Sequence, residues 1–224
     1  MTCYFISGMG ADRRIFRHIR LPAHVKPAHL DWIPFEAGEG IGEYAARLSG
    51  KIDTTEPFVL VGLSLGGIIA TEIARRSAPV CTIIIGSVPL SSQLPLYFRA
   101  VHKLRILGLV PPAFFKFAAI CKRLFTRESR DDKILIRRMI RDADPGFIRW
   151  AMLAVLRWRN DSVPDPCWHL HGTRDEVFPI WLTRPTHVIP GGGHLLVISH
   201  SEEVNALLRQ ILEPYASSTQ FIKQ

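Results

Sequence analysis

The chain has 224 residues and a hydrophobic content of 47%, which predicts one globular domain with a sizeable core. No apolar run approaches the roughly 20 residues that a membrane-spanning helix needs, which argues against an integral membrane protein. The formal net charge is +8, but no nucleic-acid-binding motif accompanies it, so we do not expect nucleic acid as a partner.

The cysteines and the first residues bear on the compartment. The chain holds four cysteines, Cys3, Cys81, Cys121 and Cys167, whose spacing gives neither a disulfide framework nor a zinc motif. The N-terminus lacks the basic region and the long apolar segment of a secretory leader, and passes directly into an apolar run. We therefore expect reduced cysteines and a cytoplasmic protein.

Short apolar runs alternate with helical patterns along most of the chain. Strands are predicted near residues 2–7, 28–33, 57–63, 80–87, 166–171 and 186–190. Helices are predicted after the capping residue Asp12, over Ile41–Ile52, directly after Ser64 and over Ser201–Leu212. This alternation predicts an α/β fold, with a mostly parallel sheet of about six strands and helices on both faces. In such a sheet the active site forms beyond the carboxyl ends of the strands.

The segment Gly62–Gly66 carries the clearest chemical signal. It reads Gly-Leu-Ser-Leu-Gly and lies between the predicted strand at 57–63 and a helical pattern that resumes at Ile68. This is the strand–turn–helix context in which a Gly-x-Ser-x-Gly turn exposes a nucleophilic serine at a helix N-terminus. A chance match or ordinary turn glycines would explain the pentapeptide alone, but the context favours Ser64 as a nucleophile.

Two later loops supply the partners that a serine nucleophile needs. Asp175 follows the predicted strand at 166–171, and His194 follows three glycines after the strand at 186–190. The order Ser64, Asp175, His194 is that of a nucleophile, an acid and a base. We expect His194 to accept the serine proton and Asp175 to orient the imidazole.

Together these motifs resemble the α/β-hydrolase family over nearly the whole chain. The turn at Ser64, the His-Gly-Thr-Arg-Asp loop ending at Asp175 and the Gly-Gly-His loop ending at His194 are similar to the family's three catalytic segments. The stretch 5–10 is similar to the loop that supplies half of the family's oxyanion hole, and Gly8–Phe16 resembles a compact bacterial branch. The resemblance implies an α/β-hydrolase fold with a Ser-His-Asp triad.

The same resemblance implies where an oxyanion would be bound. The backbone N–H of Leu65, next after the nucleophile, is one expected donor, and the N–H of Met9 is the other. Two departures from the family pattern are visible. Ser7-Gly8 stands where the family often has His-Gly, and we expect the first strand to be the one that leads into this loop, without the one or two N-terminal strands common in the family.

Other polar residues are expected to have structural or supporting roles and not to react with the substrate. His169 and His171 lie two apart on one predicted strand and so face the same side, where packing or support of the site is the usual role. No coherent third ligand accompanies them, so we expect no metal site. Glu176 is a possible substitute acid, although its side chain should diverge from that of Asp175. Asp142 and Asp144 are expected at a turn or a helix end.

The alternation of strands and helices breaks between residues 89 and 165. We expect this stretch to form a helical cap, inserted between core strands, that covers Ser64 and shields it from water. From Arg99 to Arg159 there are fifteen Lys and Arg against five Asp and Glu, a local balance of +10. A solvated basic face is the simpler explanation. A more specific explanation is that the basic residues attract an anionic substrate or make weak contact with a membrane surface.

These observations predict a serine hydrolase that cleaves a carboxylic ester or thioester through an acyl-enzyme and uses no cofactor or metal. The alternative is a non-hydrolytic member of the same fold, either an acyltransferase or a ligand-binding or scaffold protein, because fold alone does not fix function. The substrate is a small acyl compound whose identity the motifs leave open.

Overall fold

The computed structural model describes residues 1–96, 98 and 129–215. Its centre is a six-stranded sheet in which every neighbouring pair of strands is parallel, in the order β2-β1-β3-β4-β5-β6. The strands are β1 (Thr2–Ile6), β2 (Lys26–His29), β3 (Phe58–Leu63), β4 (Cys81–Ile85), β5 (Cys167–Gly172) and β6 (His187–Ile189). The α/β class and the six-stranded parallel sheet predicted from the sequence are confirmed.

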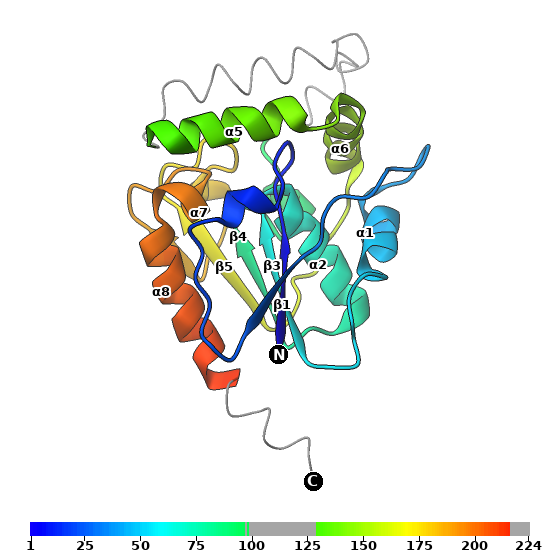
Figure 1. Ribbon diagram of the computed structural model, residues 1–224. Coiled ribbons are helices and arrows are strands. Elements are labelled where there is room, and N and C mark those ends of the chain that lie inside the picture. The colour runs from blue at the N-terminus through cyan, green and yellow to red at the C-terminus, as the bar shows by residue number, and fades with distance from the viewer. Residues whose placement is uncertain (97, 99–128, 216–224) are drawn as a thin grey trace.

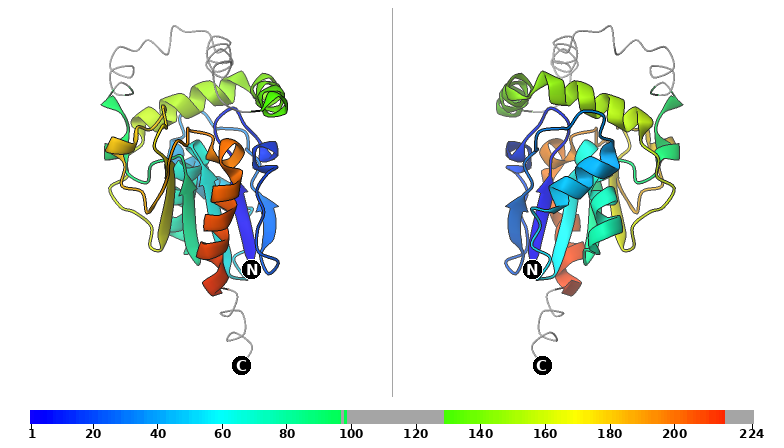
Figure 2. Two further views of the ribbon diagram at one scale, coloured as in Figure 1. Left: turned by 90° about the vertical axis from the view of Figure 1, so that its left-hand side faces the viewer. Right: turned by 90° about the vertical axis from the view of Figure 1, so that its right-hand side faces the viewer.

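Helices cover both faces of this sheet, as two opposite views show (Figure 2). One face carries α1 (Ile41–Ser49) and α2 (Leu65–Ser77), and the other carries α7 (Leu196–Ser199) and α8 (Ser201–Leu212). Each face of the sheet carries its own hydrophobic core, and alternate residues of a strand point into one or the other. In β1, Cys3 and Phe5 pack on the α8 side, and Tyr4 and Ile6 pack on the α1 side. Both faces of the central strands are thus buried, which explains their continuous apolar runs.

Two further helices lie across the end of the sheet to which the strands point (Figure 1). They are α5 (Arg130–Asp142) and α6 (Pro145–Arg157), which belong to the stretch 89–165 where a helical cap is expected. Residues 97 and 99–128 of that stretch, together with Cys121, lie outside the described residues. Short 3-10 turns complete the described part: η1 (Arg13–Phe16), η2 (Ser91–Gln93), η4 (Ile180–Leu182) and η5 (Glu213–Tyr215).

Several element boundaries differ from those predicted. The second strand is Lys26–His29, where 28–33 was expected. It starts two residues early because Lys26 already pairs with Thr2 of β1, and it ends early because the chain beyond Leu30 leaves β1, so that Ile33 bonds the Tyr44 hydroxyl instead. Asp12 does cap the segment that follows it, but that segment is the four-residue 3-10 turn η1 and not an α-helix. β4 ends at Ile85 because Gly86 adopts a positive φ of 51°.

In the described part of the chain, no helix combines the length and the apolar character that a membrane span requires.

Candidate active site

Ser64 lies at the apex of a sharp turn between β3 and α2. Its φ of 54° is in the region that L-residues avoid, so this backbone is strained. A Cβ on Gly62 would overlap the backbone of Gly66, so the turn needs glycine at position 62. The carbonyl of Ser64 accepts a hydrogen bond of 2.7 Å from the Ser87 hydroxyl, which helps to hold the strained turn.

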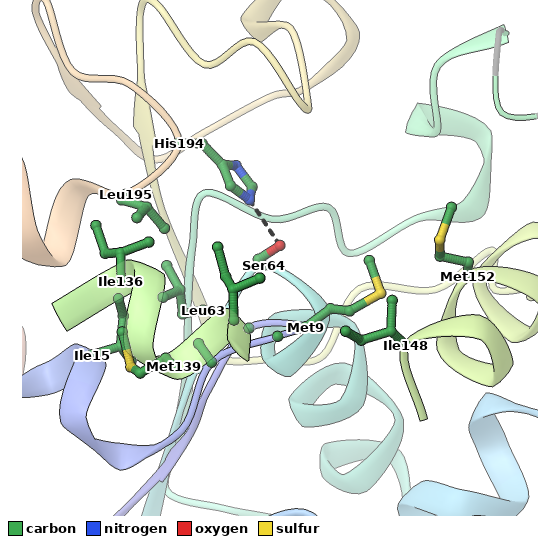
Figure 3. Close-up of a pocket in the computed structure, with 14 residues that line it drawn as sticks. Met9, Ile15, Leu63, Ser64, Ile136, Met139, Ile148, Met152, His194 and Leu195 are labelled. Atoms are coloured by element: carbon green, nitrogen blue, oxygen red, sulfur yellow. Dashed lines mark hydrogen bonds between the residues drawn. The ribbon is translucent and has the colours of Figure 1, made fainter. Parts of the chain in front are cut away.

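His194 reaches this serine from the loop after β6. Its Nε2 lies 2.8 Å from Ser64 Oγ, although the two residues are 130 positions apart (Figure 3). The loop before His194 packs closely on the end of β5, because a Cβ on Gly172 would overlap the backbone of Gly192. The predicted base and the predicted nucleophile are therefore brought together.

Asp175 lies behind the imidazole. Its Oδ2 is 2.9 Å from His194 Nδ1, and its Oδ1 accepts the N–H groups of Val177 and Phe178 at 2.8 and 2.9 Å. Burial alone would raise the pKa of Asp175, but the charge of His194 and these hydrogen bonds outweigh it and hold the pKa below 3.8. The carboxylate thus stays ionised next to the imidazole.

The loop after β1 borders the same serine. Met9 lines the same cavity as Ser64, and a Cβ on Gly8 would come within 3.4 Å of the serine Cβ. Ser7, which stands where the family often has histidine, donates its hydroxyl to the Ala11 carbonyl at 3.0 Å and so braces this loop. The N–H of Leu65 belongs to the first turn of α2, where backbone donors have no partner within the helix.

An apolar cavity opens on both sides of Ser64. We call the part below α5 the first lobe; it measures about 250 Å³, and Figure 3 shows its walls around the Ser64–His194 pair. The second lobe lies against α6 and measures about 190 Å³. Ser64, Met9 and Met152 line both lobes. Sequence motifs gave no sign of Met152, because no local pattern marks a methionine of α6 as a wall of the site.

The remaining candidates lie outside the series from Ser64 through His194 to Asp175. His169 and His171 are both buried, and their rings lie 3.0 Å apart, Nε2 to Nδ1. Across residues 1–96, 98 and 129–215 there is no cluster of three His, Cys, Asp or Glu side chains able to hold a metal ion. Asp142 is the last residue of α5 and Asp144 caps α6, which agrees with the expected helix ends.

Comparisons with known proteins agree with this fold. Residues 3–207 match the family model described as the alpha/beta hydrolase family. Among solved structures, a thermophilic esterase from Thermogutta terrifontis has 23% identity and a TM-score of 0.66, and the match covers 96% of this chain and 90% of that one.

Two further solved structures show the same likeness at lower identity. MenH from S. aureus has 17% identity and a TM-score of 0.73, with 96% of this chain and 94% of that chain covered. A lipase-esterase related protein from Clostridium acetobutylicum has 13% identity, a TM-score of 0.64 and 92% coverage of both chains. A search of curated proteins finds no match.

Proposed function

The chain belongs to the alpha/beta hydrolase family, and on this basis we propose that it is a serine hydrolase that cleaves a carboxylic ester or thioester through an acyl-enzyme. The observation that carries the proposal is the continuous hydrogen-bonded series from Ser64 Oγ through His194 to the Asp175 carboxylate. Packing alone does not require three such groups, from three separate loops, to meet in line.

In the proposed reaction, Ser64 Oγ forms a bond to the carbonyl carbon while His194 Nε2 takes the hydroxyl proton. The carbonyl oxygen becomes an oxyanion, which we assign to the N–H groups of Met9 and Leu65. The bond to the leaving group then breaks, and His194 returns the proton to the departing oxygen or sulfur. Water repeats the sequence on the acyl-enzyme, so that the acid is released and Ser64 is restored.

We also propose that residues 89–165 act as the cap expected from the sequence. Its described helices supply apolar walls on both sides of Ser64, including Ile136 from α5 and Met152 from α6. Such a cap limits the access of water and gives the substrate its specific contacts.

A fluorophosphonate probe tests the nucleophile directly, because it reacts only with an activated serine. We expect one labelled residue, Ser64, and no labelling of Ser64→Ala. Ser92→Ala, which removes an exposed hydroxyl, serves as the matched control and should label normally. Clean labelling of another serine would contradict the site assignment.

Hydrolysis of p-nitrophenyl acetate tests the other two roles. By analogy with other serine enzymes, we expect His194→Ala and Asp175→Asn each to lower kcat by about 10⁴-fold. Paired oxygen and sulfur esters of the same acid separate esterase from thioesterase activity, and product analysis with added alcohol separates hydrolysis from acyl transfer. Unchanged kcat in either variant would remove that residue from its role.

A further inference from the structure

The two lobes of the cavity differ in their relation to the proposed base. His194 and Leu195 line the first lobe, whereas the described walls of the second lobe come from residues such as Leu65, Val155 and Phe178. A leaving group must receive its proton from His194 Nε2, so its oxygen has to lie on the His194 side of the carbonyl carbon. The acyl group is then directed to the other side.

From this we propose that the substrate is an uncharged ester with a short apolar group on each side of the carbonyl, the leaving alcohol in the first lobe and the acyl group in the second. This assignment rests on the proposed function. It goes further because it orients the substrate and excludes a charge at either end.

The exclusion of charge follows from the walls. None of the described residues that line either lobe is Lys, Arg, Asp or Glu. Against these described walls, a carboxylate or phosphate would lose its hydration without gaining a cationic Lys or Arg partner from them, at a large cost in free energy. On α5, Ile136 and Ile140 face the first lobe, whereas Arg137 and Arg138 are exposed to solvent. The basic surplus of this helix therefore points away from the described walls.

The volumes set a limit on size. The two lobes measure about 250 and 190 Å³, so together they fall near the lower end of the roughly 300 to 1,000 Å³ of typical small-molecule sites. A substrate that spans both lobes is therefore expected to carry a short group on each side of its carbonyl. Until a lobe is full, each added methylene should raise kcat/KM by about two- to fourfold.

Two ester series test the assignment. The acyl series runs from p-nitrophenyl acetate through butanoate, hexanoate and octanoate to dodecanoate, and the alcohol series runs from methyl to decyl butanoate. A hexanoate ester is compared with the adipate monoester, which has the same chain length but ends in a carboxylate. Val155→Phe adds bulk to the second lobe and Ile140→Phe adds bulk to the first, so each variant is the control for the other.

We expect kcat/KM to rise and then fall along both series, and to drop at least tenfold for the adipate monoester. Val155→Phe should shorten the preferred acyl chain alone, and Ile140→Phe the preferred alcohol alone. The assignment would be overturned if the hexanoate ester and the adipate monoester had equal kcat/KM, or if kcat/KM did not change with chain length in either series. It would also be overturned if Val155→Phe altered the alcohol preference or Ile140→Phe the acyl preference. In each case acetate hydrolysis would continue. Loss of both acetate hydrolysis and phosphonate labelling would instead contradict the proposed function itself.

A separate observation concerns the buried pair of histidines on β5. His171 Nε2 lies 2.7 Å from the Phe178 carbonyl oxygen, which can only accept, so this nitrogen carries the proton. Nδ1 of the same neutral ring must then accept, and the donor is His169 Nε2 at 3.0 Å. Burial is the main reason that the pKa of His169 is lowered to about 3, and it also lowers the pKa of His171. Both rings therefore stay uncharged near neutral pH.

Phe178 connects this pair to the proposed acid. Its N–H donates to Asp175 Oδ1 at 2.9 Å while its carbonyl accepts from His171, so the residue is held from both sides. We propose that His171, itself oriented by His169, is a positioning residue that fixes the loop 175–178 and thereby the Asp175 carboxylate.

A double-mutant cycle distinguishes positioning from a general structural role. His171→Leu removes the donor, and we expect a 10- to 100-fold loss of kcat, with KM for p-nitrophenyl acetate changed less than threefold. In an Asp175→Asn background, His171→Leu should lower kcat less than threefold, because the carboxylate that His171 positions is already absent. His171→Gln, whose amide N–H can occupy the place of Nε2, should restore most of the activity.

His187→Gln, on the neighbouring strand β6, is the matched control and should leave kcat unchanged. Unfolding midpoints are measured for every variant, so that a loss of folded protein is not read as a loss of rate. The same fold-loss in both backgrounds, full activity of His171→Leu, or no recovery with His171→Gln would overturn the positioning role.

Discussion

At the scale of single residues, the site depends on how closely separate backbone segments approach at Ser64. The serine is strained, and the glycines around it allow β1, β3 and α2 to meet without side chains between them. A Cβ on Gly66 would overlap the carbonyl oxygens of Ile6 and Ser7, which belong to the segment that leads to Met9. The turn that holds the proposed nucleophile and the loop that leads to Met9 can therefore pack together only while residue 66 has no Cβ.

This coupling predicts the result of Gly66→Ala. Backbone segments yield less readily than flexible side chains, so we expect the free energy of unfolding to fall by about 3 kcal/mol or more. Gly40→Ala is the control, because a Cβ there meets nothing closer than 3.8 Å. Urea unfolding of both variants measures the difference. A Gly66→Ala protein as stable as Gly40→Ala would show that the close approach is not required.

At the scale of elements, α5 is tied to the turn η1 by two ion pairs. Arg14 bonds Asp142 at 2.9 Å, and Arg17 bonds Asp132 at 2.6 Å, so the helix above the cavity is anchored to the segment that follows the Met9 loop. These partners are more than 110 residues apart, and no sequence pattern paired them.

The pair at Asp132 predicts a pH dependence of stability. Burial opposes the charge of Asp132, but the Ser129 hydroxyl, His18 and Arg17 outweigh it and hold its pKa below 3.8. A carboxyl with a lowered pKa in the folded state stabilises the protein above its unfolded pKa, and this contribution disappears as the pH falls through the folded value.

Asp132→Asn should therefore cost about 1 kcal/mol of unfolding free energy near pH 6. The gap to wild type should begin to shrink below about pH 4 and close as the pH falls further, through the lowered pKa of the folded state. Thermal or urea unfolding between pH 3 and pH 6 measures this gap. The chains with Asp132 and with Asp132→Asn are both measured in a His18→Gln background, because His18 also contacts the Asp132 carboxylate and is itself titratable. Asp131→Asn, an exposed neighbour in the same first turn, controls for the helix dipole. A gap that stays constant as the pH falls would contradict the ionic account.

The parallel sheet and α8 followed from local periodicity, and α8 begins and ends at the predicted residues. Ser64, Asp175 and His194 could be picked out because each lies in a short glycine-bearing motif. The lobes and the bracing by His171 could not, because they arise where residues distant in sequence pack together. The shifted start of β2 had a similar origin, since its pairing with β1 decides where it begins.

At the scale of the whole molecule, the sheet separates two apolar cores, and its central strands are reached by solvent only when the fold opens. Cys3 on β1 and Cys81 on β4 are fully buried, and Cys167 at the start of β5 is half-buried. Burial raises the pKa of the Cys3 thiol, and it raises those of Cys81 and Cys167 to about 12. Few thiolates form at these positions near neutral pH, and only the thiolate is an effective nucleophile.

We therefore expect iodoacetamide at pH 8 to leave these three cysteines unmodified in the folded protein and to modify all of them in 8 M urea. Peptide mapping by mass spectrometry follows each position separately, so that Cys121 does not enter the comparison. Trp181→Cys supplies a matched positive control, because the side chain at position 181 is 80% exposed and a thiol there should react in the folded state.

As urea is raised, Cys3 and Cys81 should become reactive together, because β1 and β4 both pair with β3 in one sheet. Reaction of Cys3 well before Cys81 would show that the strands separate in stages, and the inference that the sheet unfolds as one cooperative unit would be wrong.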